Sequence, residues 1–189
     1  MENKLKRKDF WAFFKKYGYI VVLSIIVMAV AITLALTVNN DNTEPTDSTP
    51  ITLYNPILNA TVAKSYSSNS LLYNSTLKHW EAHKAITFTV GTNTDVFAVL
   101  DGTVKEIRKN YLDGTVIVIE HQEGLKSVYS SLAEDIKVKV NDVVKKGDVI
   151  GNASNTANKE LNLGNHLRFE LYENGVNIDP SSYLNLGNK

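Results

Sequence analysis

The sequence predicts an all-β domain, either a sandwich or a barrel, preceded by a single N-terminal transmembrane helix. Three observations favour this fold class. Tyr19 to Val38 form a run of twenty uncharged, mostly apolar residues. Beyond Trp80, short runs of β-branched and aromatic residues alternate with glycine-containing turns, which is typical of sandwiches and barrels. No helical period of comparable length follows Val38.

The apolar run 19–38 is long enough to cross a hydrocarbon core of about 30 Å. Six Lys and Arg residues precede it against two acidic residues, and only acidic residues follow it closely. The positive-inside rule therefore places residues 1–18 in the cytosol as a basic segment and the C-terminal part outside. The alternative is a cleaved signal peptide, but its apolar region would span only about 7–15 residues. We expect an uncleaved anchor.

The segments after the anchor differ in composition. Residues 39–50 are polar, contain two of the four prolines, and are expected to form a flexible tether. Residues 51–79 have a mixed pattern and are predicted to be an N-terminal arm of the outer domain. Residues 80–189 form the main domain, with strands expected at 85–90, 95–100, 103–107, 115–121 and 125–129.

The composition restricts the possible chemistry. Acidic and basic residues balance at 20 each, which gives no indication of a nucleic-acid partner. The chain has no cysteine, so thiol nucleophiles, disulfides and Cys zinc sites are excluded. Any histidine chemistry must use one or more of His79, His83, His121 and His166.

An ordered set of short motifs lies in the last third of the chain. Residues 147–151 read Gly-Asp-Val-Ile-Gly, residues 164–170 read Gly-Asn-His-Leu-Arg-Phe-Glu, and residues 175–180 end in Asp-Pro. Together with the glycine and hydrophobic pattern of 96–104, 115–124, 129–132 and 143–151, the stretch from about Trp80 to Tyr183 resembles the peptidoglycan endopeptidases of the M23 (LytM or lysostaphin) family. The resemblance implies a LytM/M23-type β-sandwich or barrel.

The family resemblance also implies site positions. Active members bind zinc through a His-x-x-x-Asp pair and the last His of His-x-His, and two further His residues assist proton transfer. His83 matches the first ligand, whereas Thr87 replaces the Asp and Arg168 replaces the third ligand. His166 matches one catalytic His, and Ser131 replaces the other. These matches leave only His83 and His166 as remnants of the set.

The replacements weaken a zinc site. A guanidinium has no lone pair for a metal, and losing a carboxylate while gaining a cation shifts the charge by two units against a dication. We therefore expect no zinc cofactor and no catalysis. Arg168 can pair with a nearby carboxylate, such as Glu170 or Glu81, and the sequence does not fix its partner.

A second histidine arrangement is a candidate metal site. His79, Glu81 and His83 alternate, so all three would face one side of a strand. This pattern permits a His-x-Glu-x-His site, but a polar strand edge explains it more simply. His121 precedes a turn, outside the catalytic positions, and is expected to have a structural role.

The whole chain further resembles a degenerate sporulation branch of this family in endospore-forming Firmicutes. The resemblance rests on the basic and aromatic N-terminus, the single anchor, residues 124–132 with Ser131 in place of His, and residues 174–180. It implies a non-catalytic scaffold in the forespore inner membrane. This scaffold would dock onto the outer domain of stage III sporulation protein AH in the opposing membrane, form a channel-like complex, and support engulfment.

Two other functions remain open. The chain could be an active zinc-dependent peptidoglycan endopeptidase, or a non-catalytic regulator of a cell-wall hydrolase that binds peptidoglycan. Metal content, wall cleavage and partner binding separate these possibilities.

A partner strand could pair with an exposed edge of the β domain. Two segments are candidates for that edge, and internal strands are the equally weighted alternative. Their residues are Thr115, Val116, Ile117, Val118, Ile119 and Glu120 in the first segment, and Leu125, Lys126, Ser127, Val128 and Tyr129 in the second.

Overall fold

The computed structural model describes residues 15–20, 22–30, 32–33, 51–92 and 94–186. The chain divides into two units, Met1–Thr49 and Pro50–Lys189. In the first unit, residues 15–20, 22–30 and 32–33 are helical. Within these described stretches, no helix has both the length and the apolar character needed to span a bilayer. The predicted anchor 19–38 extends beyond the described residues, and the predicted tether 39–50 lies outside them.

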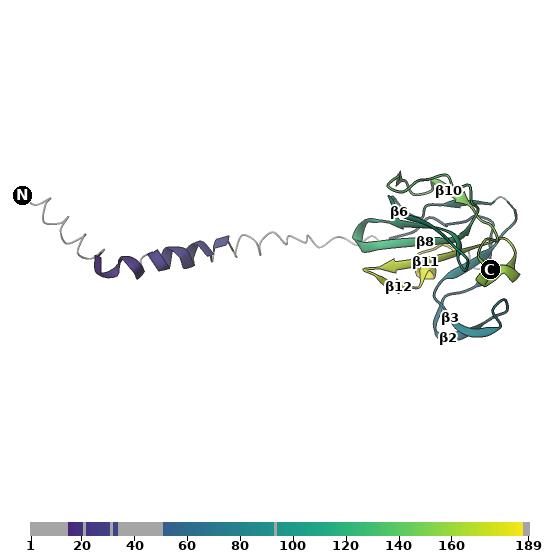
Figure 1. Cartoon of the computed structure of the whole chain (residues 1–189), viewed down its shortest axis with the longest axis horizontal. Helices are drawn as coiled ribbons and strands as arrows, with labels where there is room; N and C mark the ends of the chain where they lie inside the picture. Colours follow the sequence, from purple (N-terminus) through teal and green to yellow (C-terminus); the bar gives the residue numbers. More distant parts are fainter. Residues whose placement is uncertain (1–14, 21, 31, 34–50, 93, 187–189) are drawn as a thin grey trace, which may run out of the picture. The chain divides into compact units, whose positions relative to one another are not determined.

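The second unit is built on one large antiparallel sheet, whose strands are coloured from blue to yellow along the chain in Figure 1. Its order is β1 (Thr61–Lys64), β4 (Ile86–Thr89), β11 (His166–Glu173), β8 (Leu125–Leu132), β7 (Gly114–Glu120), β6 (Gly102–Asn110) and β9 (Val143–Val144), with β12 (Val176–Ile178) paired to β11. The prediction of a mostly β domain is confirmed.

Two small sheets and three short 3-10 helices complete the unit. β5 (Asp95–Phe97) pairs with β10 (Val149–Asn152), and β2 (Ser67–Asn74) pairs with β3 (His79–His83) as a hairpin that stands apart from the main sheet (Figure 1). The 3-10 helices are η1 (Gln122–Gly124), η2 (Asn158–Leu163) and η3 (Pro180–Ser182). η2 carries a buried carboxylate, Glu160.

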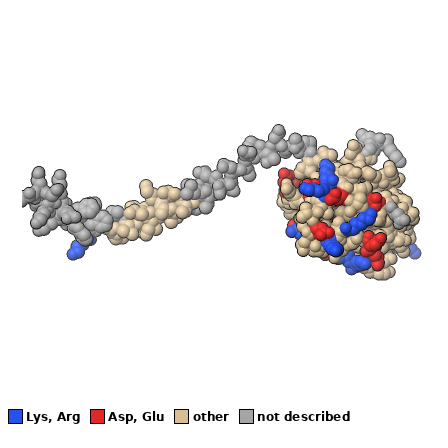
Figure 2. Space-filling model, turned by 90° about the horizontal axis from the view of Figure 1, so that it is seen from above, with Lys and Arg blue, Asp and Glu red and all other residues tan. Residues whose placement is uncertain are grey.

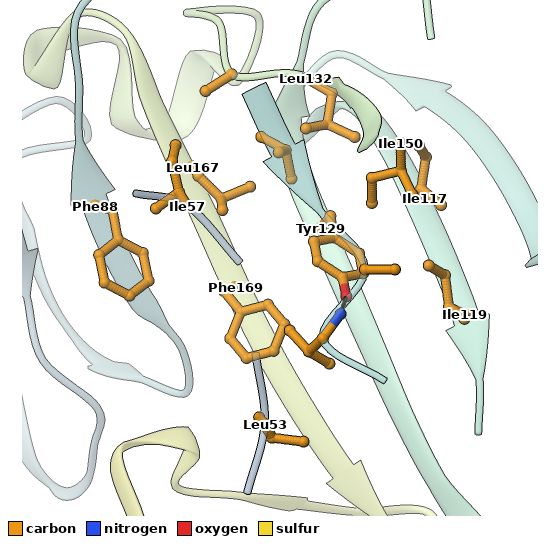
Figure 3. Packing of buried hydrophobic residues seen from close by; sticks show 14 of the residues in the cluster. Leu53, Ile57, Phe88, Ile117, Ile119, Tyr129, Leu132, Ile150, Leu167 and Phe169 are labelled. Atoms are coloured by element: carbon orange, nitrogen blue, oxygen red, sulfur yellow. Dashed lines mark hydrogen bonds between the residues drawn. The ribbon is translucent and has the colours of Figure 1, made fainter. Parts of the chain in front are cut away.

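The hydrophobic core lies against one face of the main sheet. Side chains alternate along a strand, so Leu167 and Phe169 of β11 face the core, next to Tyr129 of β8 (Figure 3). The intervening Arg168 faces the opposite side of the sheet. The Tyr129 hydroxyl accepts a hydrogen bond from the Val99 amide at 3.0 Å, which satisfies both groups inside the core.

The segment 51–79, predicted as an N-terminal arm of the outer domain, is joined to the core and to the main sheet of the second unit. Leu53 and Ile57 are buried in the core (Figure 3), and β1 pairs with β4 in the main sheet. Their burial anchors this segment to the rest of the unit, since buried aliphatic side chains each contribute about 1.5–3 kcal/mol.

The two candidate docking strands are internal, so the edge interpretation is wrong for both. β7 lies between β8 and β6, and β8 lies between β11 and β7. Their main-chain groups are already paired on both sides. The ends of the sheet order are β1 and β9, and β9 covers only Gly102 and Thr103 of β6.

The surface of the second unit carries mixed charges. On the face shown in Figure 2, Lys and Arg side chains intermingle with Asp and Glu. A mixed pattern of this kind produces no extended field of one sign that would steer a polyanion.

Candidate functional site

The positions that match the family's site converge on one face of the main sheet. Arg168 of β11 lies directly opposite Thr87 of β4 in the strand register. His83 ends β3, and its Nε2 is 3.1 Å from the Thr87 hydroxyl. His166 begins β11 on the same side as Arg168. The structure thus brings together four of the five positions singled out in the sequence.

A carboxylate from η2 occupies the space between these side chains. Glu160 is only 1% exposed. Its Oε1 accepts a hydrogen bond from Lys64 Nζ at 3.0 Å and lies 3.8 Å from Arg168 Nη1. Its Oε2 accepts a hydrogen bond from the Thr87 hydroxyl at 3.2 Å. The Glu160 cluster, as the term is used below, consists of Lys64, His83, Thr87, Glu160, His166 and Arg168.

The charges of this cluster explain the ionisation of Glu160. Burial alone would raise the pKa of its carboxyl, but the charges of Arg168 and Lys64 and the Lys64 hydrogen bond outweigh burial and lower the pKa. Glu160 is therefore a carboxylate at neutral pH. A buried carboxylate needs such partners, because an unpaired one would neutralise instead.

A chain of hydrogen bonds fixes the neutral form of His83. Arg168 can only donate, so His83 Nδ1 accepts from Arg168 Nη1 at 3.1 Å. The ring hydrogen then lies on Nε2 and is donated to the Thr87 hydroxyl, which donates in turn to Glu160. Burial, followed by the Arg168 charge, lowers the pKa of His83 from 6.5 to about 4. Both ring nitrogens of His83 are engaged.

His166 is held differently. Its Nδ1–H donates to the Gly164 carbonyl at 2.7 Å. Its Nε2 is buried without a hydrogen-bond partner and lies 3.9 Å from Glu160 Oε2. Burial lowers the pKa of His166. The ring therefore presents an unused lone pair toward the carboxylate.

The cluster continues along β11. Arg168 Nε donates to Glu170 Oε1 at 3.1 Å, which confirms Glu170 as a partner of Arg168. Glu170 Oε2 accepts from the Tyr172 hydroxyl at 2.8 Å. Burial and the Glu170 carboxylate raise the pKa of Tyr172 to about 12. The other candidate, Glu81, instead accepts hydrogen bonds from Asn74 and His79.

Ser131 is engaged with the backbone rather than with the Glu160 cluster. Its hydroxyl donates to the Ser154 carbonyl at 2.8 Å, and it is fully buried. Its φ of 66° lies in the left-handed region, which is uncommon for residues other than glycine. The surrounding hydrogen bonds hold this conformation.

The alternating histidines of β3 separate into two environments. His79 Nε2 lies 3.1 Å from Glu81 Oε2 near the surface, whereas His83 joins the Glu160 cluster. In the part of the chain that the structure describes, no group of three or more His, Cys, Asp or Glu side chains is placed to hold a metal ion. His121 lies elsewhere, between the Asp101 carbonyl at 2.9 Å and the Ser127 hydroxyl at 2.7 Å.

Sequence reasoning missed Glu160 and Lys64. Glu160 lies 73 residues from Thr87 and 96 residues from Lys64, outside every motif. The sequence does contain one indication of a missing acidic residue: the cation Arg168 stands at a buried ligand position, and a buried cation requires a compensating negative charge.

Comparison with known proteins identifies the family. The model for peptidase family M23 matches residues 81–180. The chain belongs to peptidase family M23. The resemblance inferred from its motifs is thereby confirmed.

The similar proteins include one named as a sporulation protein and one named as a peptidase. Stage II sporulation protein Q of Bacillus subtilis is 38% identical over 94 residues, which is 50% of this chain and 32% of that protein. The DD-carboxypeptidase/endopeptidase Mpg of Neisseria meningitidis is 28% identical over 106 residues, 56% of this chain and 24% of that protein. The matches thus span about a third or less of these relatives. The similarity to stage II sporulation protein Q confirms the resemblance to a sporulation branch.

Solved structures share the fold. A structure described as the SpoIIQ-SpoIIIAH pore forming complex matches with a TM-score of 0.62 and 28% identity, over 70% of this chain and 90% of that one. The catalytic domain of lysostaphin from Staphylococcus simulans matches with a TM-score of 0.54 and 26% identity, over 66% of this chain and 92% of that one. The sporulation and peptidase members thus share one architecture with this chain.

Proposed function

We propose that this chain is a non-catalytic, membrane-anchored docking protein of endospore formation. Its outer domain would bind the outer domain of a stage III sporulation protein AH-like partner in the opposing membrane. The pair would form part of a channel-like complex and support engulfment. The similarity to stage II sporulation protein Q and to a SpoIIQ–SpoIIIAH complex supports the partner.

The Glu160 cluster is the observation that carries the non-catalytic part of this proposal. Zinc would need deprotonated donors with free lone pairs, but both nitrogens of His83 are already hydrogen-bonded. Lys64 and Arg168 supply two positive charges around the one buried carboxylate, and they would repel a dication. The residues present do not fit a zinc ion.

The N-terminal segment supports an anchored location. Its apolar run 19–38 and the basic residues before it favour a single-pass orientation with a cytosolic N-terminus. In a sporulating cell this orientation would place the anchor in the forespore inner membrane and the outer domain in the intermembrane space.

Docking would use a sheet edge other than β7 and β8. Past Thr103, the outer side of β6 has no strand partner among the described residues, because β9 pairs only with Gly102 and Thr103. Such an edge can accept a partner strand through main-chain hydrogen bonds. Hydrogen exchange measured with and without the partner tests this edge. Amides of residues 105–110 are expected to gain protection, and unchanged exchange there would exclude it.

Co-purification tests the proposed function. The full chain in mild detergent is mixed with the outer domain of the stage III AH-like partner, and with peptidoglycan in a parallel experiment. Co-elution with the partner, without wall cleavage, is expected. Retention on peptidoglycan without partner binding would favour the hydrolase regulator, and wall cleavage with stoichiometric zinc would favour the endopeptidase.

A further inference from the structure

The β2–β3 hairpin, which stands apart from the main sheet in Figure 1, has an inner face and an outer face. On the inner face, Asn74 is buried and its Nδ2 donates to the Lys159 carbonyl at 3.1 Å. His83 lies on the same face and enters the Glu160 cluster. Side chains alternate along each strand, so these contacts turn the residues in between toward the outside.

The outer face is apolar and open to solvent. Tyr73 lies directly opposite Trp80 in the strand register, with ring centroids 5.5 Å apart, and Leu71 lies opposite Ala82. The exposed fractions are 59% for Leu71, 49% for Tyr73 and 64% for Trp80. A two-stranded hairpin has little stability of its own, so a surface that covers this face would stabilise the hairpin.

The exposed charges around this face are positive. Residues 61–84 contain one acidic residue, Glu81, which is half-buried and accepts hydrogen bonds from Asn74 and His79. Lys78 and Lys84, which flank β3, are both exposed. Trp and Tyr side chains favour the headgroup level of a bilayer, and lysines beside them attract anionic lipids. The composition of this face therefore fits a membrane surface.

The area of the face also favours a bilayer over a second protein. Tyr73 and Trp80 together expose on the order of 200 Å². A stable protein interface buries about 800 Å² on each partner and needs a complementary surface. A bilayer needs no such surface, because its affinity for an apolar face scales with whatever area that face buries.

The proposed anchor keeps the hairpin within reach of the bilayer. Residues 39–50 separate the apolar run from Ile51, and a chain of that length spans at most roughly 40–45 Å. The second unit, Pro50–Lys189, has a diameter of about 40 Å for its length, so each of its faces can reach the bilayer. Because the link is short, docking is an intramolecular event at high effective concentration, and a weak affinity for lipid suffices.

We propose that the outer face of the β2–β3 hairpin docks onto the bilayer that holds the anchor. Trp80 would lie at the headgroup level, and Lys78 and Lys84 would meet anionic headgroups. The inference rests on the membrane anchoring in the proposed function. Docking would also orient the outer domain: the hairpin adjoins β4 through His83, whereas β6 lies toward the other end of the sheet order, where its free edge stays available to a partner strand.

The fluorescence of Trp80 in reconstituted vesicles tests this inference. The chain has two Trp residues, so W11F leaves Trp80 as the only one. The full W11F chain is placed in vesicles of phosphatidylcholine and phosphatidylglycerol, with or without bromine on the acyl chains near the headgroups. Brominated lipid should lower the Trp80 emission at least about twofold, because docked side chains enter the boundary between headgroups and acyl chains.

Two further variants separate docking from mere proximity. W11F/W80F/V143W moves the single Trp to β9, where Val143 is 74% exposed, and brominated lipid should leave its emission unchanged. K78E/K84E in the W11F chain should reduce the quenching of Trp80 at least about twofold, since attraction to anionic lipid becomes repulsion.

Three results would overturn the inference. Trp80 emission is unaffected by brominated lipid, the reporter at position 143 is quenched as strongly as Trp80, or Trp80 responds only when the stage III AH-like partner is added, which would assign the face to a protein interface. Flotation of the vesicles after an alkaline wash distinguishes the failures. A chain that floats without quenching contradicts the docking alone, whereas a chain that does not float contradicts the anchor and the docking with it.

Discussion

Replacing Glu160 by Gln should destabilise the outer domain far more than the same change at a surface ion pair. The substitution keeps the shape of the side chain and removes its charge. It leaves Lys64 and Arg168 facing a neutral amide at a position that is 1% exposed. Removing one member of a buried ion pair costs about 3–5 kcal/mol, because the remaining charge is uncompensated.

The structure places the expected cost near the lower end of this range. The Lys64 side chain is 14% exposed and can turn partly toward water, and Arg168 keeps its bond to Glu170. We expect a loss of about 3 kcal/mol in the free energy of unfolding. For a unit of this size that corresponds to a fall of about 10 °C in the midpoint of thermal unfolding.

A matched control is available in β6. Glu106 lies 3.0 Å from Arg108, but the two side chains are 52% and 41% exposed. E106Q should therefore cost less than about 1 kcal/mol. Thermal unfolding of the full chain in mild detergent, followed by near-UV circular dichroism, compares both variants with the natural chain. About 1 kcal/mol corresponds to about 3 °C for this unit. If the midpoint of E160Q lies within about 3 °C of that of E106Q, the argument that Glu160 is a buried charge centre is refuted.

The remaining predictions concern titration and the core. The pKa of His83 is lowered from 6.5 to about 4 in the folded chain. Between these two pH values the unfolded chain therefore binds more protons than the folded chain. The stability due to neutral His83 is fully present above pH 6.5 and should fall by about 3 kcal/mol as the pH drops to 4. In thermal melts across this pH range, H83Q should lose that part of the pH dependence of stability, whereas H79Q should keep it. Equal dependence of stability on pH in H83Q and the natural chain would contradict the reasoning. Y129F should cost about 1–3 kcal/mol in unfolding free energy measured by the same melts, because the Val99 amide loses its acceptor inside the core. A neutral result for Y129F would mean that another acceptor replaces the hydroxyl.

The strands were predictable because their signals are local. The expected strands at 85–90, 115–121 and 125–129 correspond to β4, β7 and β8. The family motifs likewise located His83, Thr87, His166 and Arg168, which the fold then brings together. Local periodicity and motif order suffice where each residue's role is set by its own strand.

The position of a strand within the sheet was harder to predict. The run Val116–Ile119 is buried on both faces, as in a central strand. Its uninterrupted apolar sequence already indicated this position, since an exposed edge would carry charges or proline.

The Glu160 cluster could not be predicted from local patterns. Its carboxylate comes from a short 3-10 segment, and Lys64 comes from the segment predicted as the N-terminal arm of the outer domain. The contact between them joins residues 96 positions apart. Only the requirement that a buried guanidinium be neutralised pointed to a missing acid, and Glu170 next to Arg168 satisfied that requirement in part.

The zinc content of the natural full chain tests the central claim most directly. The chain is purified without chelators, dialysed against excess zinc and then against zinc-free buffer, and analysed by mass spectrometry of the metal. The Glu160 cluster predicts substoichiometric zinc, because Glu160 and His83 are engaged by Lys64, Thr87 and Arg168 and the two cations repel a dication. One tightly bound zinc ion per chain would contradict the account.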